Sequence, residues 1–200
     1  MRNLRLLALL IVIPLLYGCA AAVIGGAGTA VLVGEDRRTV GTQAEDQGIE
    51  LKAAGRLRER FRDPHINVTS FNRNILLTGE APDADTKAQI ERIVRQVPNA
   101  RGVVNEIQIA GVSSFSARGN DSYLTSKVKA RFIDISGSFS PNHVKVVTEN
   151  GVVYLLGLVS RKEAEAAVEI ARTTGGVQKV VRVFEYTDTP PAPASTPPSK

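Results

Sequence analysis

Two histidines and one cysteine are the side chains in this 200-residue chain with the widest range of chemistry. A zinc site needs three or four His, Cys or carboxylate ligands at suitable spacing, and no such set is evident around His65 or His143. We therefore interpret both histidines as loop residues and expect no metal and no dissociable cofactor. No nucleophile elbow, P-loop, dinucleotide fingerprint or Cys–His pair is present, so we expect a protein that is not an enzyme.

The single cysteine, Cys19, follows a segment typical of exported proteins. Two arginines lie in the first five residues, and the apolar run over residues 6–16 is too short for a comfortable membrane span. The sequence Leu-Tyr-Gly-Cys at 16–19 resembles the bacterial lipobox, whose cysteine thiol takes the lipid. We expect residues 1–18 to be removed as a signal peptide and Cys19 to carry covalent lipid. A buried core thiol is the alternative, and one cysteine allows no internal disulfide.

The residue after the cysteine indicates which of the two bacterial membranes holds the protein. It is Ala20 rather than aspartate, which by resemblance to sorted lipoproteins favours the outer membrane. We expect a lipid anchor in the inner leaflet of a Gram-negative outer membrane, with the folded part facing the periplasm. Removing residues 1–18 takes away Arg2 and Arg5 and lowers the formal net charge from +5 to +3. So small an excess, in the periplasm, argues against nucleic acid as a partner.

The folded part repeats itself. The sequence INVTSFNRNILLTG at 66–79 matches VKVVTENGVVYLLG at 144–157 at an offset of 78 positions. VVNEI at 103–107 then matches VVRVF at 180–184 at an offset of 77. A period this long indicates two tandem copies of one small domain, because the units of solenoids are shorter.

Composition places the boundaries of these copies. Residues 19–42 change from small and apolar to polar and are expected to be a flexible tether, and the proline-rich residues 187–200 a disordered tail. The remaining segments are a first domain, a linker and a second domain, at 43–110, 111–120 and 121–186.

Each copy shows the same order of patterns. A first helix is followed by two alternating strands, which meet at Asn72-Arg73 in the first copy and at Asn150-Gly151 in the second. Asn-Gly is a strong hairpin signal. A second helix (83–96 and 161–174) and a valine-rich strand (102–109 and 179–186) complete each copy. The predicted class is α+β, with two αββαβ units that each cover a three-stranded sheet with two helices.

The two copies resemble BON domains. Each quoted segment ends in a strand-terminal glycine and precedes an amphipathic helix and a strand that contains VVN or VVR. With the lipobox and RRTVGTQ at 37–43, residues 16–186 are similar to the dual BON-domain outer-membrane lipoproteins. The resemblance implies a non-enzymatic protein that binds anionic phospholipid through the first helix of its second domain and supports outer-membrane integrity.

The sequence of the first helix of the second domain can be examined for features that suit binding to anionic phospholipid. Asp121 is a plausible N-cap. An advance of 100° per residue gathers four apolar residues on the side that must face the sheet: Leu124, Val128, Phe132 and Ile135. Tyr123 and Ile133 fall roughly opposite, beside lysines, which suits an anionic lipid surface. The candidate lipid-binding residues are Tyr123, Ser126, Lys127, Lys129, Ala130, Arg131 and Ile133.

Alternatives stay open at this point. Tyr123 can equally pack against the other domain or be an ordinary exposed aromatic residue. The first helix of copy one is richer in cations, but they spread around its polar face without an aromatic residue, so a solvated surface is the better interpretation: Lys52, Arg56, Arg58, Arg60 and Arg62. The second functional hypothesis is an adaptor for a protein partner in outer-membrane assembly or envelope remodelling. Binding to anionic vesicles separates the two hypotheses.

Overall fold

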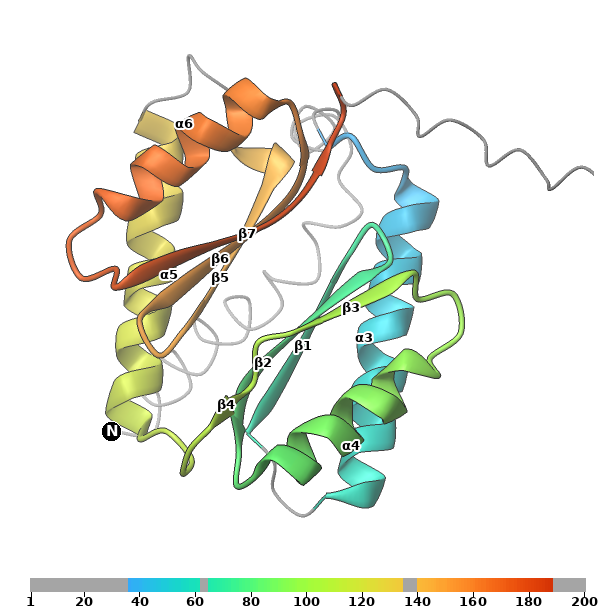
Figure 1. Ribbon diagram of the computed structural model, residues 1–200. Helices are drawn as coiled ribbons and strands as arrows, with labels where there is room; N and C mark the ends of the chain where they lie inside the picture. The colour runs from blue at the N-terminus through green and yellow to red at the C-terminus, as the bar shows by residue number, and fades with distance from the viewer. Residues whose placement is uncertain (1–35, 62–64, 135–139, 189–200) are drawn as a thin grey trace, which may run out of the picture. The chain divides into compact units, whose positions relative to one another are not determined.

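The computed structural model describes residues 36–61, 65–134 and 140–188 (Figure 1). The predicted signal peptide, Cys19, the tether up to residue 35 and the tail from residue 189 lie outside these ranges, as does Ile135. The described residues from Arg37 onward form one compact unit that contains both repeats. No helix in the described ranges is long and apolar enough to cross a bilayer.

The first repeat folds into helix α3 (Val40–Arg60), strands β1 (Ile66–Phe71) and β2 (Asn74–Ala81), helix α4 (Ala84–Arg95) and strand β3 (Gly102–Asn105). β1 pairs antiparallel with β2, and β3 pairs parallel with β2 on its other side. Both helices lie on the same face of this sheet (Figure 1). The core between helices and sheet is built around Ile49, Leu57, Ile75, Leu77, Ile90, Val94 and Ile107.

The second repeat has the same plan. Its elements are α5 (Phe115–Asp134), the short 3-10 helix η1 (Pro141–His143), β5 (Val144–Glu149), β6 (Val152–Val159), α6 (Arg161–Arg172) and β7 (Lys179–Tyr186). The strand order is β5-β6-β7, with β5 antiparallel and β7 parallel to β6. The predicted class of two tandem αββαβ units is confirmed. Leu124, Val128 and Phe132 of α5 are buried against the sheet, as the helical periodicity predicts.

The ends of several elements differ from the sequence prediction. α3 begins at Val40, within the segment interpreted as tether, and Thr39 caps it by accepting the Thr42 N–H at 3.1 Å. The strand predicted over 102–109 is interrupted after Asn105, and only the two-residue β4 (Gln108–Ile109) continues beside β2. The interruption allows Ile107 to turn into the core, where it is buried.

The prediction that Asp121 is a helix N-cap is wrong. α5 begins at Phe115, so Asp121 lies in its second turn and is buried. Its carboxylate accepts the backbone N–H groups of Asn150 at 2.9 Å and Gly151 at 2.8 Å. Asp46 of α3 accepts the N–H groups of Asn72 and Arg73 in the same way, at 2.9 and 2.7 Å. In each domain a carboxylate of the first helix therefore caps the hairpin turn, an arrangement that we call the hairpin cap.

Both hairpin turns have the two-residue form that the sequence predicts. The backbone φ angles are +49° at Asn72 and +66° at Arg73, and +49° at Asn150 and +72° at Gly151. Positive φ at both central residues matches the right-handed twist of the strands. Arg73 adopts a conformation that costs energy for a side chain with a Cβ, and its hydrogen bond to Asp46 offsets part of that cost.

The two sheets pack on one another through the faces that their helices leave uncovered. Phe71 and Leu76 of the first domain form one buried cluster with Tyr154 and Leu156 of the second. Burial, with Glu106 and Glu149 nearby, raises the pKa of Tyr154 to about 12. Polar pairs surround the cluster: Asn67 with Glu149 at 2.7 Å, Lys145 with Glu50 at 3.0 Å, and Asn74 with Glu185 at 2.9 Å. Each sheet is thus covered on both faces.

Candidate functional site

The rotation of α5 about its axis is fixed by contacts along its whole length. Ser114 Oγ accepts the Ala117 N–H at 3.2 Å and caps the start of the helix. The hairpin cap at Asp121 and a hydrogen bond of 2.8 Å from Thr125 Oγ1 to Thr148 Oγ1 bind the helix to the β5–β6 hairpin. With the apolar side held on the sheet, the opposite side faces solvent.

Large apolar side chains lie on that solvent side. Tyr123 is 61% exposed and Ile133 is 63% exposed, so both lie off the core of the domain. Phe115 is 87% exposed and was missed, because the sequence pattern assigned it to the linker. At 100° per residue, Phe115 and Ile133 point in the same direction, about 80° from Tyr123. We call these three residues the apolar stripe.

The remaining candidate residues divide into two groups. Ser126, Lys129 and Ala130 are exposed near the apolar stripe. Lys127 and Arg131 are half-buried and turn toward the end of α6. Lys127 Nζ donates to Gly175 O at 2.7 Å, and Arg131 donates to Ile170 O and Thr174 Oγ1 at 2.7 and 2.8 Å.

These bonds satisfy carbonyl groups at a helix C-terminus, where cations are favourable. The structure thus gives Lys127 and Arg131 a role within the domain that the sequence did not reveal. Lys127 Nζ also lies 5.3 Å from the centre of the Tyr123 ring, which keeps one ammonium beside the apolar stripe.

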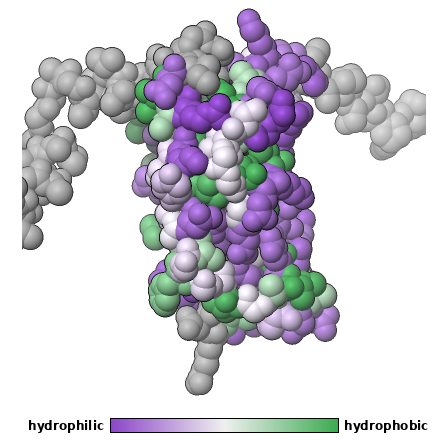
Figure 2. All heavy atoms as spheres, turned by 90° about the vertical axis from the view of Figure 1, so that its left-hand side faces the viewer, coloured by the Kyte–Doolittle hydropathy of each residue, from purple (hydrophilic) through white to green (hydrophobic). Residues whose placement is uncertain are grey.

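Figure 2 shows the face of the molecule over α5 and α6. Hydrophobic residues lie there as separate patches among polar ones rather than as one broad apolar surface. A permanent protein interface is usually larger and more continuous. This pattern suits a contact that forms and breaks.

The competing helix of the first domain has a different surface. α3 exposes Lys52, Arg58 and Arg60 together with Leu51, which is 70% exposed. Arg56 donates to Gln96 O at 2.7 Å and so contributes to the structure of the domain. Arg62 lies outside the described residues. In its described residues α3 exposes cations with two aliphatic side chains, Val40 and Leu51, and no aromatic residue lies among them.

Each histidine precedes the first strand of its repeat and lies beside a carboxylate. His65 directly precedes β1, and its Nδ1 lies 2.7 Å from Glu80 Oε2. His143 ends η1, and its Nδ1 lies 3.2 Å from Glu163 Oε1. Their carboxylate partners are 15 and 20 residues away in the chain, so local spacing did not indicate them.

Glu163 is strongly acidic. Burial favours its neutral form, but hydrogen bonds from Arg37, Ser160 and His143 favour the carboxylate more and hold its pKa at about 2. Arg37 binds both carboxylate oxygens, at 2.8 and 2.9 Å. This pair joins the residues ahead of α3 to the second domain.

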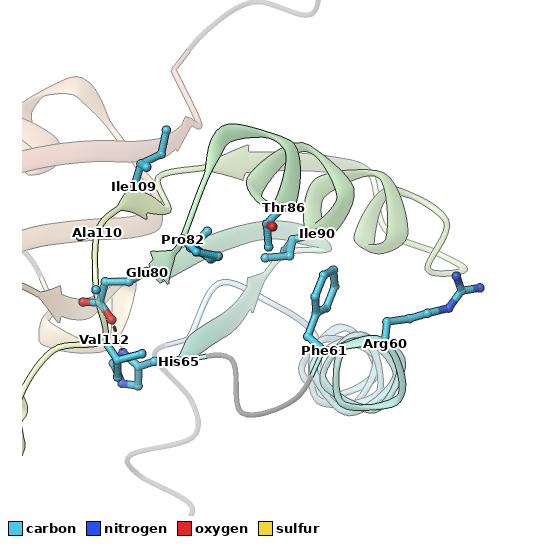
Figure 3. Close-up of a pocket in the computed structure, with 12 residues that line it drawn as sticks. Arg60, Phe61, His65, Glu80, Pro82, Thr86, Ile90, Ile109, Ala110 and Val112 are labelled. Carbon is cyan, nitrogen blue, oxygen red and sulfur yellow. Dashed lines mark hydrogen bonds and ion pairs between the residues drawn. The ribbon is translucent and has the colours of Figure 1, made fainter.

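A cavity of about 670 Å³ opens in the first domain beside His65 (Figure 3). Phe61 and Arg60 of the α3 end lie at one side of it, and His65 and Glu80 lie at the other. Ile90 of α4 contributes to the apolar wall between them.

Comparisons with known proteins place the two repeats in a family. The BON domain profile matches residues 45–111 and 120–188. The chain is 38% identical over 176 residues to outer membrane lipoprotein DolP of Haemophilus influenzae, a match that covers 86% of this chain and 91% of that protein. It is 31% identical over 154 residues to the 21 kDa hemolysin of Actinobacillus pleuropneumoniae, covering 76% and 79%.

Among solved structures, the C-terminal domain of CdsD, a structural protein of the type III secretion system of Chlamydia trachomatis, aligns with 67% of this chain. That match covers 94% of the solved chain at 12% identity, and its TM-score is 0.28. This likeness is too low to support an argument about fold or function.

Proposed function

The chain belongs to the BON domain family and is an outer-membrane lipoprotein of the cell envelope, and we propose that it binds anionic phospholipid through the exposed side of α5. In this proposal the protein is a non-enzymatic binding module. Lipid on Cys19 anchors it to the inner leaflet of the outer membrane, facing the periplasm, and α5 recognises the lipid around the anchor.

The observation that carries the proposal is the apolar stripe. Two aromatic rings and an isoleucine project from one side of a helix whose opposite side is buried in the domain. Side chains of this kind enter the headgroup region of a bilayer, where a ring and an aliphatic group lose contact with water. Lys129, which is exposed, and Lys127, beside the Tyr123 ring, lie within reach of lipid phosphates.

The estimated free energies of charge attraction and apolar insertion favour a weak, selective contact with lipid. Each cation near an anionic surface contributes about 1 kcal/mol, so the two lysines contribute about 2 kcal/mol. Full burial of a large apolar side chain contributes about 1.5–3 kcal/mol, and partial insertion of the three stripe residues contributes less than the sum. Insertion is therefore at least as important as charge. The acyl chains on Cys19 supply the permanent attachment.

Vesicle sedimentation tests the proposal. The unlipidated chain from residue 20 is mixed with anionic and with zwitterionic vesicles, and the bound fraction is compared with that of a variant carrying Tyr123→Glu and Ile133→Glu. We expect wild type to bind anionic vesicles and the double variant to bind about tenfold more weakly, because two carboxylates oppose the surface potential and replace the inserting groups. Added salt weakens the wild-type binding, since exposed charges are screened.

Two further variants serve as controls. Leu51→Glu places one carboxylate of the same kind on a similarly exposed position of α3 and should leave vesicle binding unchanged. Leu124→Glu buries a charge and unfolds the domain, which circular dichroism detects. If the double variant binds vesicles like wild type, α5 is not the lipid contact.

The alternative is an adaptor for an envelope protein partner. It is favoured by the apolar residues exposed on α3, Val40 and Leu51, each 70% exposed. A partner captured equally well with and without anionic lipid, and lost on Leu51→Glu, supports the adaptor instead.

A further inference from the structure

We propose that His65, Glu80 and Glu149 bind a zinc ion between the two domains. One ligand atom from each of these residues lies within 4.8 Å of the others. His65 Nδ1 is 2.7 Å from Glu80 Oε2 and 3.9 Å from Glu149 Oε1. His65 and Glu80 belong to the first domain and Glu149 ends β5 of the second, so the ion joins the domains. This inference is independent of the lipid contact on α5.

Neighbouring side chains orient both carboxylates toward the histidine. Glu80 Oε1 accepts from Asn150 Nδ2 at 2.6 Å, and Glu149 Oε2 accepts from Asn67 Nδ2 at 2.7 Å and from Thr78 Oγ1 at 3.2 Å. The second oxygen of each carboxylate is thereby directed at His65. Outer partners that fix the ligating oxygen in this manner are characteristic of metal sites.

Glu80 Oε2 and His65 Nδ1 have one further neighbour, Ser113. Its backbone N–H donates to Glu80 Oε2 at 3.3 Å, and its hydroxyl lies 3.4 Å from His65 Nδ1. Both contacts are long, so they leave the oxygen and the nitrogen able to take a metal bond in place of the present hydrogen bond.

The charge of the cluster calls for a cation. Glu80 and Glu149 are 4% and 3% exposed, and buried carboxylates are stable only when paired or coordinated. In the described ranges, His65 is the only basic side chain that forms an ion pair with either of them. With His65 neutral, as a metal ligand must be, the two carboxylates match the charge of a divalent ion.

The second repeat provides an internal comparison. His143 occupies the equivalent place, 78 residues after His65, and also faces a carboxylate, Glu163. There the guanidinium of Arg37 binds both oxygens of that carboxylate. In the second repeat the charge of Glu163 is therefore neutralised by a side chain of the protein. Beside His65, in contrast, a second carboxylate takes the place of the arginine, and the two negative charges need a cation. This difference points to a cation from solution.

The geometry fits zinc after small shifts. Zinc bonds to nitrogen and oxygen are about 2.0–2.1 Å long, which separates ligand atoms of a tetrahedral site by roughly 3.3 Å. The His65–Glu80 pair must open by about 0.6 Å and the His65–Glu149 pair close by about 0.6 Å. His65 and Glu80 line the cavity of Figure 3, which provides an entry path and space for a water as fourth ligand.

Calorimetry on the full lipidated chain in detergent, after removal of metal with a chelator, tests the site. We expect one zinc per chain and an increase in melting temperature when zinc is added. His65→Asn and Glu149→Gln should each weaken zinc binding at least tenfold. His143→Asn is the matched control and should leave zinc affinity unchanged, because Arg37 already neutralises Glu163.

A second measurement does not depend on the stability of the variants. Cobalt(II) bound to the wild-type chain should show the intense visible absorption bands of a four-coordinate site, and zinc should displace it. The proposal is overturned if no zinc binds, if His143→Asn weakens binding as much as His65→Asn, or if magnesium binds as tightly as zinc, which would indicate general attraction to carboxylates.

Discussion

Replacement of the hairpin-cap aspartates by asparagine tests whether these carboxylates hold the turns. Asp121 accepts two backbone N–H groups, whereas Asp46 accepts two backbone N–H groups, the Ser70 hydroxyl at 2.7 Å and the Arg38 guanidinium at 2.9 Å. Asparagine has nearly the same shape but one acceptor oxygen, and its NH₂ group faces a donor. The decrease in the free energy of unfolding can therefore be calculated from the number of hydrogen bonds that each substitution removes.

Hydrogen bonds to a charged group contribute about 1.5–3 kcal/mol each. Asp121→Asn removes one such bond and should lower the free energy of unfolding by about 2–3 kcal/mol. Asp46→Asn removes two and leaves Arg38 without the carboxylate, so it should cost roughly 4–5 kcal/mol. Glu59→Gln, on the exposed side of α3, is the control and should stay within about 0.5 kcal/mol.

Urea denaturation followed by circular dichroism measures these differences, provided that the m-value is unchanged. Amide exchange at Gly151 gives a local measurement, because its N–H loses protection only if the cap is lost. The reasoning is refuted if Asp121→Asn matches the Glu59 control, or if Asp46→Asn costs no more than Asp121→Asn.

Two other predictions concern acid stability and the second hairpin. The pKa of Glu163 is held at about 2, below its ordinary 4.5, so its stabilisation is complete above pH 4.5 and is lost as the pH falls toward 2. Glu163→Gln should reduce the fall in melting temperature across this range, and equal slopes would show that Glu163 is unimportant there. Gly151→Val should cost about 1–2 kcal/mol in urea denaturation, because valine is strained at a φ of +72° and its Cβ would lie 2.7 Å from Gln178. Gly111→Ala, where a Cβ meets nothing, is its control, and an unchanged midpoint for Gly151→Val contradicts the turn assignment.

The parts of the fold that depend on local patterns were predictable from sequence. Asn150-Gly151 specifies its turn by backbone preference alone. Periodic burial of Leu124 and Val128 orients α5, and it correctly left Tyr123 and Ile133 on the exposed side. The exposure of these two side chains, which the lipid-binding hypothesis requires, was therefore predictable from the sequence of a single helix.

Features that depend on distant residues were not predictable. The first turns of α5 pack against no core, so residues 115–120 show no helical repeat of apolar side chains. The helix was therefore predicted to begin later, and Asp121 resembled its N-cap. Leu76 and Tyr154 interrupt the alternation of their strands because both faces are buried. The apolar runs indicate that something covers the second face, but not that the other repeat does. His65, Glu80 and Glu149 lie at the ends of three different strands and meet only in the folded chain.

The adjacent arginines ahead of α3 have a mechanical consequence for a protein held at one end. Arg37 forms an ion pair with Glu163 of the second domain. Arg38 forms an ion pair with Asp46 of the first domain, and its guanidinium carbon lies 3.9 Å from the centre of the Phe71 ring. Because these contacts lie ahead of α3, we expect a pulling force on the N-terminal side of the chain to act on both domains before it acts on α3. We expect a force applied from the membrane to load both domains together rather than to pull the first helix away from its sheet.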